Sequence, residues 1–271
     1  MAIPKINHFK LTMANTSVQE QLTATLLDQV FVHDEQKDAM LHEYKKLAGA
    51  YINIDHSIAV LSDFQADKSY IYVGSFGKIF GMESGNIVID SAFEECIFSK
   101  IHPDDLTERH ILELSYFRYL KKQPVQEREK YSTFSRIRAC NTVGDYCYVN
   151  HRNIYLKTLP NDGVWLALCT YAPSADVSLR PGIDGKIVNN ETGEVISFEN
   201  YKDYGQGLLS KRETEVLTHV AKGMGSKQIA EQLNIAVHTV RRHRQNIIHK
   251  MQVANTAEAV KTCIVMGIIT I

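Results

Sequence analysis

The side chains best suited to chemistry in this chain are the basic and amide groups of one C-terminal segment. The 26 residues from Gln232 to Ala257 contain no carboxylate, yet Arg241, Arg242 and Gln245 lie within five positions of one another. A run of cations on a helical pattern is the electrostatic feature that suits a phosphate backbone. It could equally be a solvated helix face, so the direction of each side chain decides between these interpretations.

The directions of these side chains follow from the helical period of about 100° per residue. One side of the predicted helix would carry a stripe that can enter a core: Val240, His243, Ile247 and Met251. The opposite side would carry most of the donors: His238, Arg241, Arg242, Gln245 and His249. Arg244 and Lys250 fall on the flanks. Because arginine can bond guanine in a bidentate manner and glutamine can bond adenine, this phase favours reading of DNA bases.

The charge of the chain is divided unevenly. Residues 207–271 hold nine Lys and Arg against four Asp and Glu, whereas the remainder holds 21 against 27. The net charge of −1 for all 271 residues hides this split. We therefore expect two modules with different partners.

The elements that would position the basic side chains are four short helices after Leu209. Ser210 and Glu213 form a capping box at the start of the first helix. A three-residue turn at 234–236 separates the second helix from the third, which gives the pair the dimensions of a helix-turn-helix.

Several short motifs in this region resemble the LuxR-type helix-turn-helix over residues 208–270. They are Leu209-Ser210, Arg212–Leu217, Ala221-Lys222-Gly223, Ser226–Ala230, Leu233-Asn234-Ile235, Thr239–His243, Lys250-Met251 and Val253–Val260. The resemblance implies that the third helix enters the major groove of double-stranded DNA and that the fourth joins a homodimer. It implies base contacts by Arg241, Arg242 and Gln245. Phosphate contacts would come from Lys227, Thr239, Arg244 and Lys250, with His238 and His249 beside them on the DNA-facing side.

Three positions depart from that family pattern. Ala236 replaces the usual Ser or Thr cap of the recognition helix, which costs about 1 kcal/mol. Gly225 replaces a capping serine with a smaller penalty, and Thr256 replaces an arginine beside Asn255. The DNA-facing side is unaffected by these changes.

The larger, acidic part of the chain reads as an α+β domain. A helical segment is expected at 1–50, followed by a domain at 51–173 and a linker at 174–207 with a possible β-hairpin. Helical residues 93–120 interrupt five β-prone runs: Ser57–Phe64, Ser69–Val73, Thr133–Ala139, Tyr146–Leu156 and Val164–Tyr171. Strands, a helix and further strands in this order are typical of an antiparallel sheet with helices.

The same order resembles a PAS domain. The residues that carry the resemblance are Tyr70–Val73, Ile79–Met82, Ile101–Leu106, Phe134–Arg138 and Gly144-Asp145-Tyr146. It implies a five-stranded antiparallel sheet with helices on one face, which senses a small molecule or another protein. The separate all-α domain at 208–271 would be its output.

The sequence gives little reason to expect a cofactor. Nothing around Cys96 resembles a flavin-binding cysteine motif, and His110 fits a core position better than a haem ligand. Cys140 and Cys147 are symmetric about the Val143-Gly144 turn, so a redox pair and two ordinary thiols are both open, with ordinary thiols favoured. We predict no haem, flavin or metal.

Other functional classes lack their required patterns. No nucleophile–base pair, metal-ligand spacing or phosphate loop points to an enzyme, and no apolar run approaches the length of a membrane span. The expectation is a cytoplasmic, homodimeric transcription regulator whose PAS-like domain senses a ligand. The alternative is that this domain binds a protein partner and no small molecule.

Overall fold

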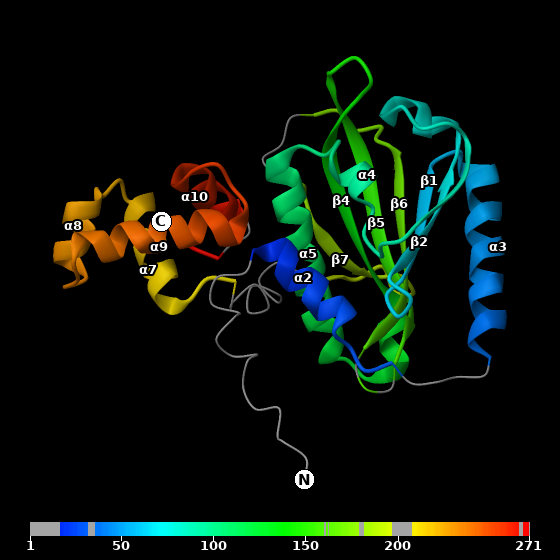
Figure 1. The fold of residues 1–271 in the computed structure, drawn as a ribbon, viewed down its shortest axis with the longest axis horizontal. Coiled ribbons are helices and arrows are strands. Elements are labelled where there is room, and N and C mark those ends of the chain that lie inside the picture. Colours follow the sequence, from blue (N-terminus) through cyan, green and yellow to red (C-terminus); the bar gives the residue numbers. More distant parts are fainter. Residues whose placement is uncertain are drawn as a thin grey trace, which may run out of the picture.

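The computed structural model divides into a sheet-containing part and a helical part, which we call the sheet domain and the helical domain (Figure 1). The structure describes residues 17–31, 36–159, 161, 163–178, 182–196, 208–265 and 268–270.

The sheet domain is built on one eight-stranded antiparallel sheet with the order β3-β2-β1-β6-β5-β4-β7-β8. Its strands are β1 (Ile58–Asp63), β2 (Lys68–Val73), β3 (Gly85–Ile89), β4 (Tyr131–Cys140), β5 (Tyr146–Thr158), β6 (Val164–Pro173), β7 (Lys186–Asn189) and β8 (Val195–Ile196). Strands β1, β2, β4, β5 and β6 correspond to the five β-prone runs of the sequence.

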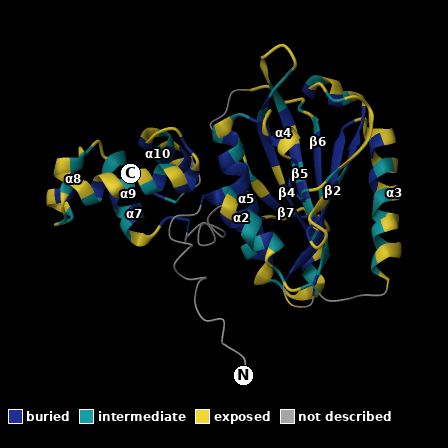
Figure 2. Ribbon diagram, in the orientation of Figure 1, coloured by how far each residue is buried: buried dark blue, intermediate teal, exposed yellow. Residues whose placement is uncertain are grey.

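Helices cover the two faces of this sheet unequally (Figure 1). Helices α2 (Val18–Leu27), α4 (Glu95–Phe98) and α5 (Pro103–Lys121) lie on one side, which we call the inner face, and α3 (Lys37–Asp55) lies on the other, the outer face. Short 3-10 helices η2 (Ser75–Phe80) and η3 (Val125–Lys130) connect strands. Figure 2 shows that α5 is largely buried, whereas α3 is exposed along one side.

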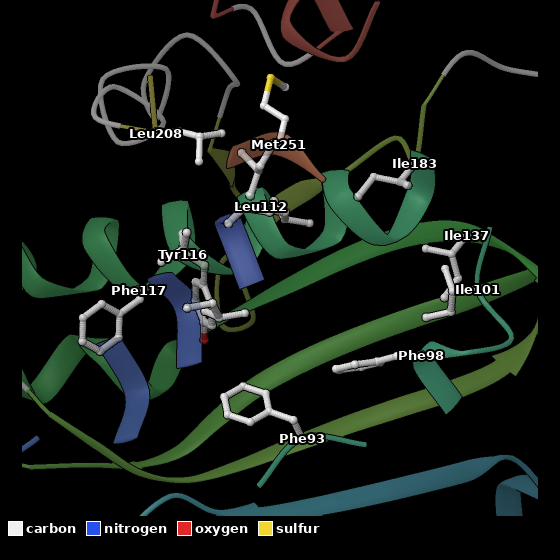
Figure 3. Close-up of a cluster of buried hydrophobic side chains, with 14 of the residues drawn as sticks. Phe93, Phe98, Ile101, Leu112, Tyr116, Phe117, Ile137, Ile183, Leu208 and Met251 are labelled. Carbon is white, nitrogen blue, oxygen red and sulfur yellow. The ribbon is translucent and has the colours of Figure 1, made fainter. Parts of the chain in front are cut away.

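Two local signals explain the position of α5. His102 caps its start, because the His102 Nδ1 accepts a hydrogen bond from the Asp104 amide at 3.2 Å, and Pro103 occupies its first turn. Tyr116 and Phe117 then lie with Phe93 and Phe98 between the helix and the sheet (Figure 3). The core position expected for His110 is confirmed, since its side chain is 0% exposed.

The expectation of a five-stranded sheet was wrong in number. β3 adds an edge strand beside β2, and its residues are almost all exposed, so no buried apolar pattern announced it. At the other edge β7 pairs with β4 and with β8, so the hairpin expected in the linker extends the sheet. Helix α3 also continues to Asp55, beyond the expected end of the first segment.

Cys140 and Cys147 do not face each other across their hairpin. Cys140 lies opposite Tyr146 and Cys147 lies opposite Ala139, so the two thiols occupy neighbouring register positions on opposite faces. Both are free. The register therefore supports two ordinary thiols.

The helical domain consists of α7 (Lys211–Ala221), α8 (Ser226–Gln232), α9 (Val237–Met251) and α10 (Thr256–Val265). It contacts the sheet domain through α10 and α5, where Lys261 Nζ lies 3.2 Å from Asp104 Oδ2. Gln252 also donates to Gln19 at 3.3 Å. The buried apolar side chains of the two domains form one continuous cluster.

Candidate nucleic-acid interface

Helix α9 has one side packed into the helical domain. Val240, Ile247 and Met251 are all 0% exposed, and His243 is half-buried on the same side. Helices α7 and α8 pack against this side of α9. The apolar stripe therefore fixes the rotation of α9 about its own axis.

The remaining sides of α9 present hydrogen-bond donors to solvent. Five of the expected DNA-binding side chains on this helix are exposed: His238, Arg241, Arg242, Gln245 and His249. Thr239 is half-buried in the first turn of α9, and Lys227 is exposed on α8. The structure thus brings these groups together around one solvent-facing surface, which we call the α9 surface.

Lys250 is paired within the helical domain, so the structure does not support the phosphate contact expected of it. Its side chain is buried, and Nζ lies 2.7 Å from Oε2 of Glu213, which is buried as well. A cation that is desolvated and paired inside the domain would have to leave its carboxylate before it could contact a phosphate. Lys250 therefore joins α9 to α7.

Glu213 is the residue that sequence reasoning missed as the partner of Lys250. Its carboxylate also accepts hydrogen bonds from the Ser210 amide and hydroxyl, both at 2.8 Å, within the predicted capping box. Burial alone would raise the pKa of Glu213, but the Lys250 and Ser210 hydrogen bonds outweigh burial and lower it. The capping motif was visible in the sequence, whereas nothing local pointed to a lysine 37 positions away.

Arg244, which was also expected to contact a phosphate, makes hydrogen bonds within the helical domain. Its Nη1 donates to Ser226 Oγ at 3.2 Å, and its Nη2 donates to Thr256 Oγ1 at 2.7 Å. Ser226 begins α8 and Thr256 begins α10. The guanidinium of Arg244 therefore connects three helices, and Thr256, noted as a departure in the sequence, is one of its acceptors.

Helices α8 and α9 both begin without a side-chain cap from the residue before them, as Gly225 and Ala236 predict. Ala236 precedes α9 without any side-chain cap, which leaves the first amides of α9 without that partner. At α8, the Gln228 side chain accepts from the Gly225 amide at 2.9 Å, so half of a capping box forms without a serine.

Two kinds of feature are absent from the residues that the structure describes. Within them, no group of three or more His, Cys, Asp or Glu side chains is placed to hold a metal ion. None of the described helices is both long and apolar enough to cross a membrane.

Comparison with known proteins places the helical domain in a family. Residues 207–263 match the model of the bacterial regulatory proteins of the luxR family. The oxygen regulatory protein NreC of Staphylococcus haemolyticus is 33% identical over 110 residues, which cover 39% of this chain and 48% of NreC. NreC of Staphylococcus epidermidis is 35% identical over 111 residues, covering 39% and 49%. The chain therefore spans about half the length of these curated relatives.

Solved structures give a weaker likeness. The phage VqmA–DPO complex is 15% identical with a TM-score of 0.29, covering 88% of this chain and 94% of that chain. The VqmA dimer of Vibrio cholerae is 13% identical with a TM-score of 0.29, covering 82% and 88%. The family model and the four helices together identify the helical domain as a LuxR-type helix-turn-helix domain.

Proposed function

We propose that this protein is a sequence-specific transcription regulator that binds double-stranded DNA as a homodimer. The observation that carries the proposal is the α9 surface, where donors face solvent while the opposite side of the same helix is anchored in a core. An anchored helix with exposed arginine and glutamine side chains suits insertion into a major groove.

The residues of the α9 surface take different roles in this proposal. Arg241, Arg242 and Gln245 contact base edges, because they lie near the middle of the exposed side. Lys227 and Thr239 contact phosphates at its border, with His238 and His249 beside them. Arg244 and Lys250 hold the domain together and make no contact with DNA.

Selection of DNA fragments by the full chain, followed by fluorescence anisotropy on the selected site, tests this assignment. Arg241→Ala should relax the base preference at one position of each half-site, by about 1–3 kcal/mol of discrimination. Lys227→Ala should weaken binding to all sequences and reduce the salt slope by about 1. Lys78→Ala, the same change at an exposed position of the sheet domain, is the matched control. If the full chain selects no sequence, the proposal fails.

The sheet domain is proposed to be PAS-like and to sense a small molecule. Its five central strands form an antiparallel sheet with α5 across the inner face, which is the arrangement that the PAS resemblance implies. Three additional strands and a helix on the outer face go beyond that arrangement.

A buried polar cluster under α5 supports small-molecule sensing. Arg109 lies 3.3 Å from both Glu94 and Glu113, Tyr171 donates to Glu94 at 2.6 Å, and Asn153 donates to Glu113 at 2.9 Å. Several atoms of the cluster have no hydrogen-bond partner among the described residues: Arg109 Nε, His151 Nε2, Asn153 Oδ1 and the Tyr155 hydroxyl. Buried polar atoms are costly without partners, so a small polar ligand or ordered water would complete the cluster.

A specific observation favours the alternative of a protein partner. The outer side of α3 leaves Leu47, Tyr51 and Ile54 exposed, by 61%, 43% and 82%. Spacings of four and three residues place these side chains on one helical stripe, as in helix–helix interfaces. The stripe supports a dimerisation or partner-binding surface.

The two roles of the sheet domain give different results on substitution. Sedimentation of Ile54→Lys should show a monomer if the α3 stripe joins two copies, whereas Asn53→Lys, an exposed neighbour on another side of α3, should not change the mass. Native mass spectrometry of the purified chain should reveal a bound small molecule that Asn153→Leu removes. Absence of any bound small molecule from the original chain would favour the partner-binding alternative, whereas retention of the same mass in Asn153→Leu would mean that the ligand binds outside the buried cluster.

A further inference from the structure

The outer face of the sheet contains an open cleft beside α3. It has a volume of about 550 Å³, within the size range of small-molecule sites. Helix α3 packs over β1 and β2, whereas the outer side of β4, β5 and β7 has no helix over it among the described residues. The cleft therefore lies on the opposite side of the sheet from the buried cluster around Arg109.

Strand register builds the floor of the cleft. Lys186 of β7 lies opposite Phe134 of β4, Phe134 lies opposite Arg152 of β5, and Arg152 lies opposite Thr170 of β6. Paired residues in antiparallel strands share a face, so these four side chains form one row across the sheet. Tyr51 at the end of α3 forms part of the lining.

Within the described part of the chain, Arg152 is the cation of this row that has no acidic partner. Arg136 lies 3.0 Å from Asp176, and Lys186 lies 2.9 Å from Asp184, so both of these cations in the cleft are neutralised. Arg152 bonds only neutral groups among the described residues: its Nε donates to Ser132 Oγ at 3.3 Å and its Nη2 donates to Asn190 Oδ1 at 2.8 Å. Burial lowers the pKa of Arg152, since its charge has lost part of its hydration.

The surroundings of Arg152 are aromatic. Its guanidinium centre lies 4.7 Å from the centre of the Phe134 ring, and Phe134 is still 38% exposed. Tyr51 is 43% exposed. A cation held in place by two hydrogen bonds and bordered by exposed rings can pair with an anion while the rings contact a flat apolar body.

We propose that this cleft binds a small aromatic carboxylate, with Arg152 pairing with the carboxylate and Phe134 and Tyr51 contacting the ring. The site goes beyond the proposed function, because it lies outside the buried cluster and the α9 surface and shares only Tyr51 with the exposed stripe of α3. Binding there is measured without DNA, so failure of one proposal does not decide the other.

Benzoate, with benzamide as the neutral analogue of the same shape, is the probe that tests the cleft. We expect benzoate to shift amide resonances of β4, β5 and β6 in the ¹⁵N-labelled full chain, with a Kd of roughly 1 mM, as a ligand of this size permits. Benzamide should bind at least about tenfold more weakly, because it cannot form the ion pair.

Matched variants locate the interaction. Arg152→Gln should weaken benzoate binding at least about tenfold, whereas Lys157→Gln, which removes a charge from β5 outside the cleft, should leave it unchanged. Phe134→Leu should also weaken benzoate binding, although it leaves the charge of Arg152 in place. This variant tests the cleft even if Arg152→Gln does not fold.

Several results would overturn the proposal. They are the absence of shifts at 20-fold the expected Kd of roughly 1 mM, equal binding of benzamide, equal losses in Arg152→Gln and Lys157→Gln, and shifts confined to the basic α9 surface. The last result would mean nonspecific attraction of anions to the helical domain.

Discussion

Helices α5 and α9 both carry several ionisable side chains, but those of α5 are mostly buried and those of α9 are mostly exposed to solvent. On α5, Glu108, Arg109, His110 and Glu113 are all at most 5% exposed. On α9, the arginines at 241 and 242 are exposed, and Lys250 is the only ionisable side chain that is buried. A charged residue type therefore says little about its role until its burial is known. The buried charges hold elements together, and the exposed ones are free to meet a partner.

The largest expected effect comes from removing the central cation of α5. Arg109→Met should destabilise the chain by about 3–5 kcal/mol, because it leaves Glu94 and Glu113 buried without a counter-charge. The same substitution on the exposed side of α9, Arg241→Met, should change stability by less than about 0.5 kcal/mol. Urea denaturation followed by circular dichroism measures both. Similar losses in the two variants would remove the contrast between the helices.

Lys250 is the exception on α9, and its substitution sharpens the comparison. Lys250→Met should cost about 3 kcal/mol of stability in the helical domain, because Glu213 stays buried and unpaired. Folded molecules of Lys250→Met should show the same salt dependence of DNA affinity as the original chain. If the salt slope fell by about 1 while stability stayed unchanged, Lys250 would contact a phosphate after all. Adding Glu213→Leu should recover part of the loss.

Glu108 on α5 predicts a pH dependence. Burial is the main cause that raises its pKa to about 7, although the Ile183 amide donates to its carboxylate at 2.9 Å. The folded chain then holds a proton that the unfolded chain releases above the ordinary value of 4.5, so stability should fall as pH rises from about 4.5 to 7.

Glu108→Gln removes this titration and isolates its effect. At pH 8 the variant should be more stable than the original by up to about 3 kcal/mol, and the difference should vanish below about pH 4.5. Denaturation midpoints across this range provide the measurement. A constant difference at all pH values would show that Glu108 does not titrate in this window.

The smallest effect concerns the start of α9. Ala236→Ser should stabilise the helical domain by about 1 kcal/mol, because a serine oxygen can accept a hydrogen bond from an amide that has no cap at present. Gly225→Ser, at the start of α8, should gain only a few tenths. Thermal unfolding of both variants measures the two stability gains. A larger gain for Gly225→Ser than for Ala236→Ser would contradict this prediction.

The sequence predicted what depends on local periodicity. The strand runs matched five of the strands, and the capping box of Ser210 with Glu213 formed as its spacing indicates. The phase of Val240 and Ile247 also predicted the buried side of α9. Each of these patterns is contained within a few residues of chain.

What the sequence did not predict depends on which distant segments meet. Helical phase placed Lys250 on a flank of α9, but it gave no information about Glu213 on α7. The edge strand β3 lacks a buried alternating pattern, because none of its side chains is buried. The row from Lys186 to Thr170 arises from the pairing of four strands, so no single stretch of sequence contains it.

The hydrogen bonds of Arg244 have a thermodynamic consequence for recognition. By tying the first residue of α8 and the first residue of α10 to α9, this side chain removes orientational freedom from α9 when the domain folds. The entropy of that ordering is lost before any partner arrives, so association does not have to offset it. A helix held in this way meets a groove as a preorganised surface, and the free energy of its contacts can go to distinguishing one base sequence from another.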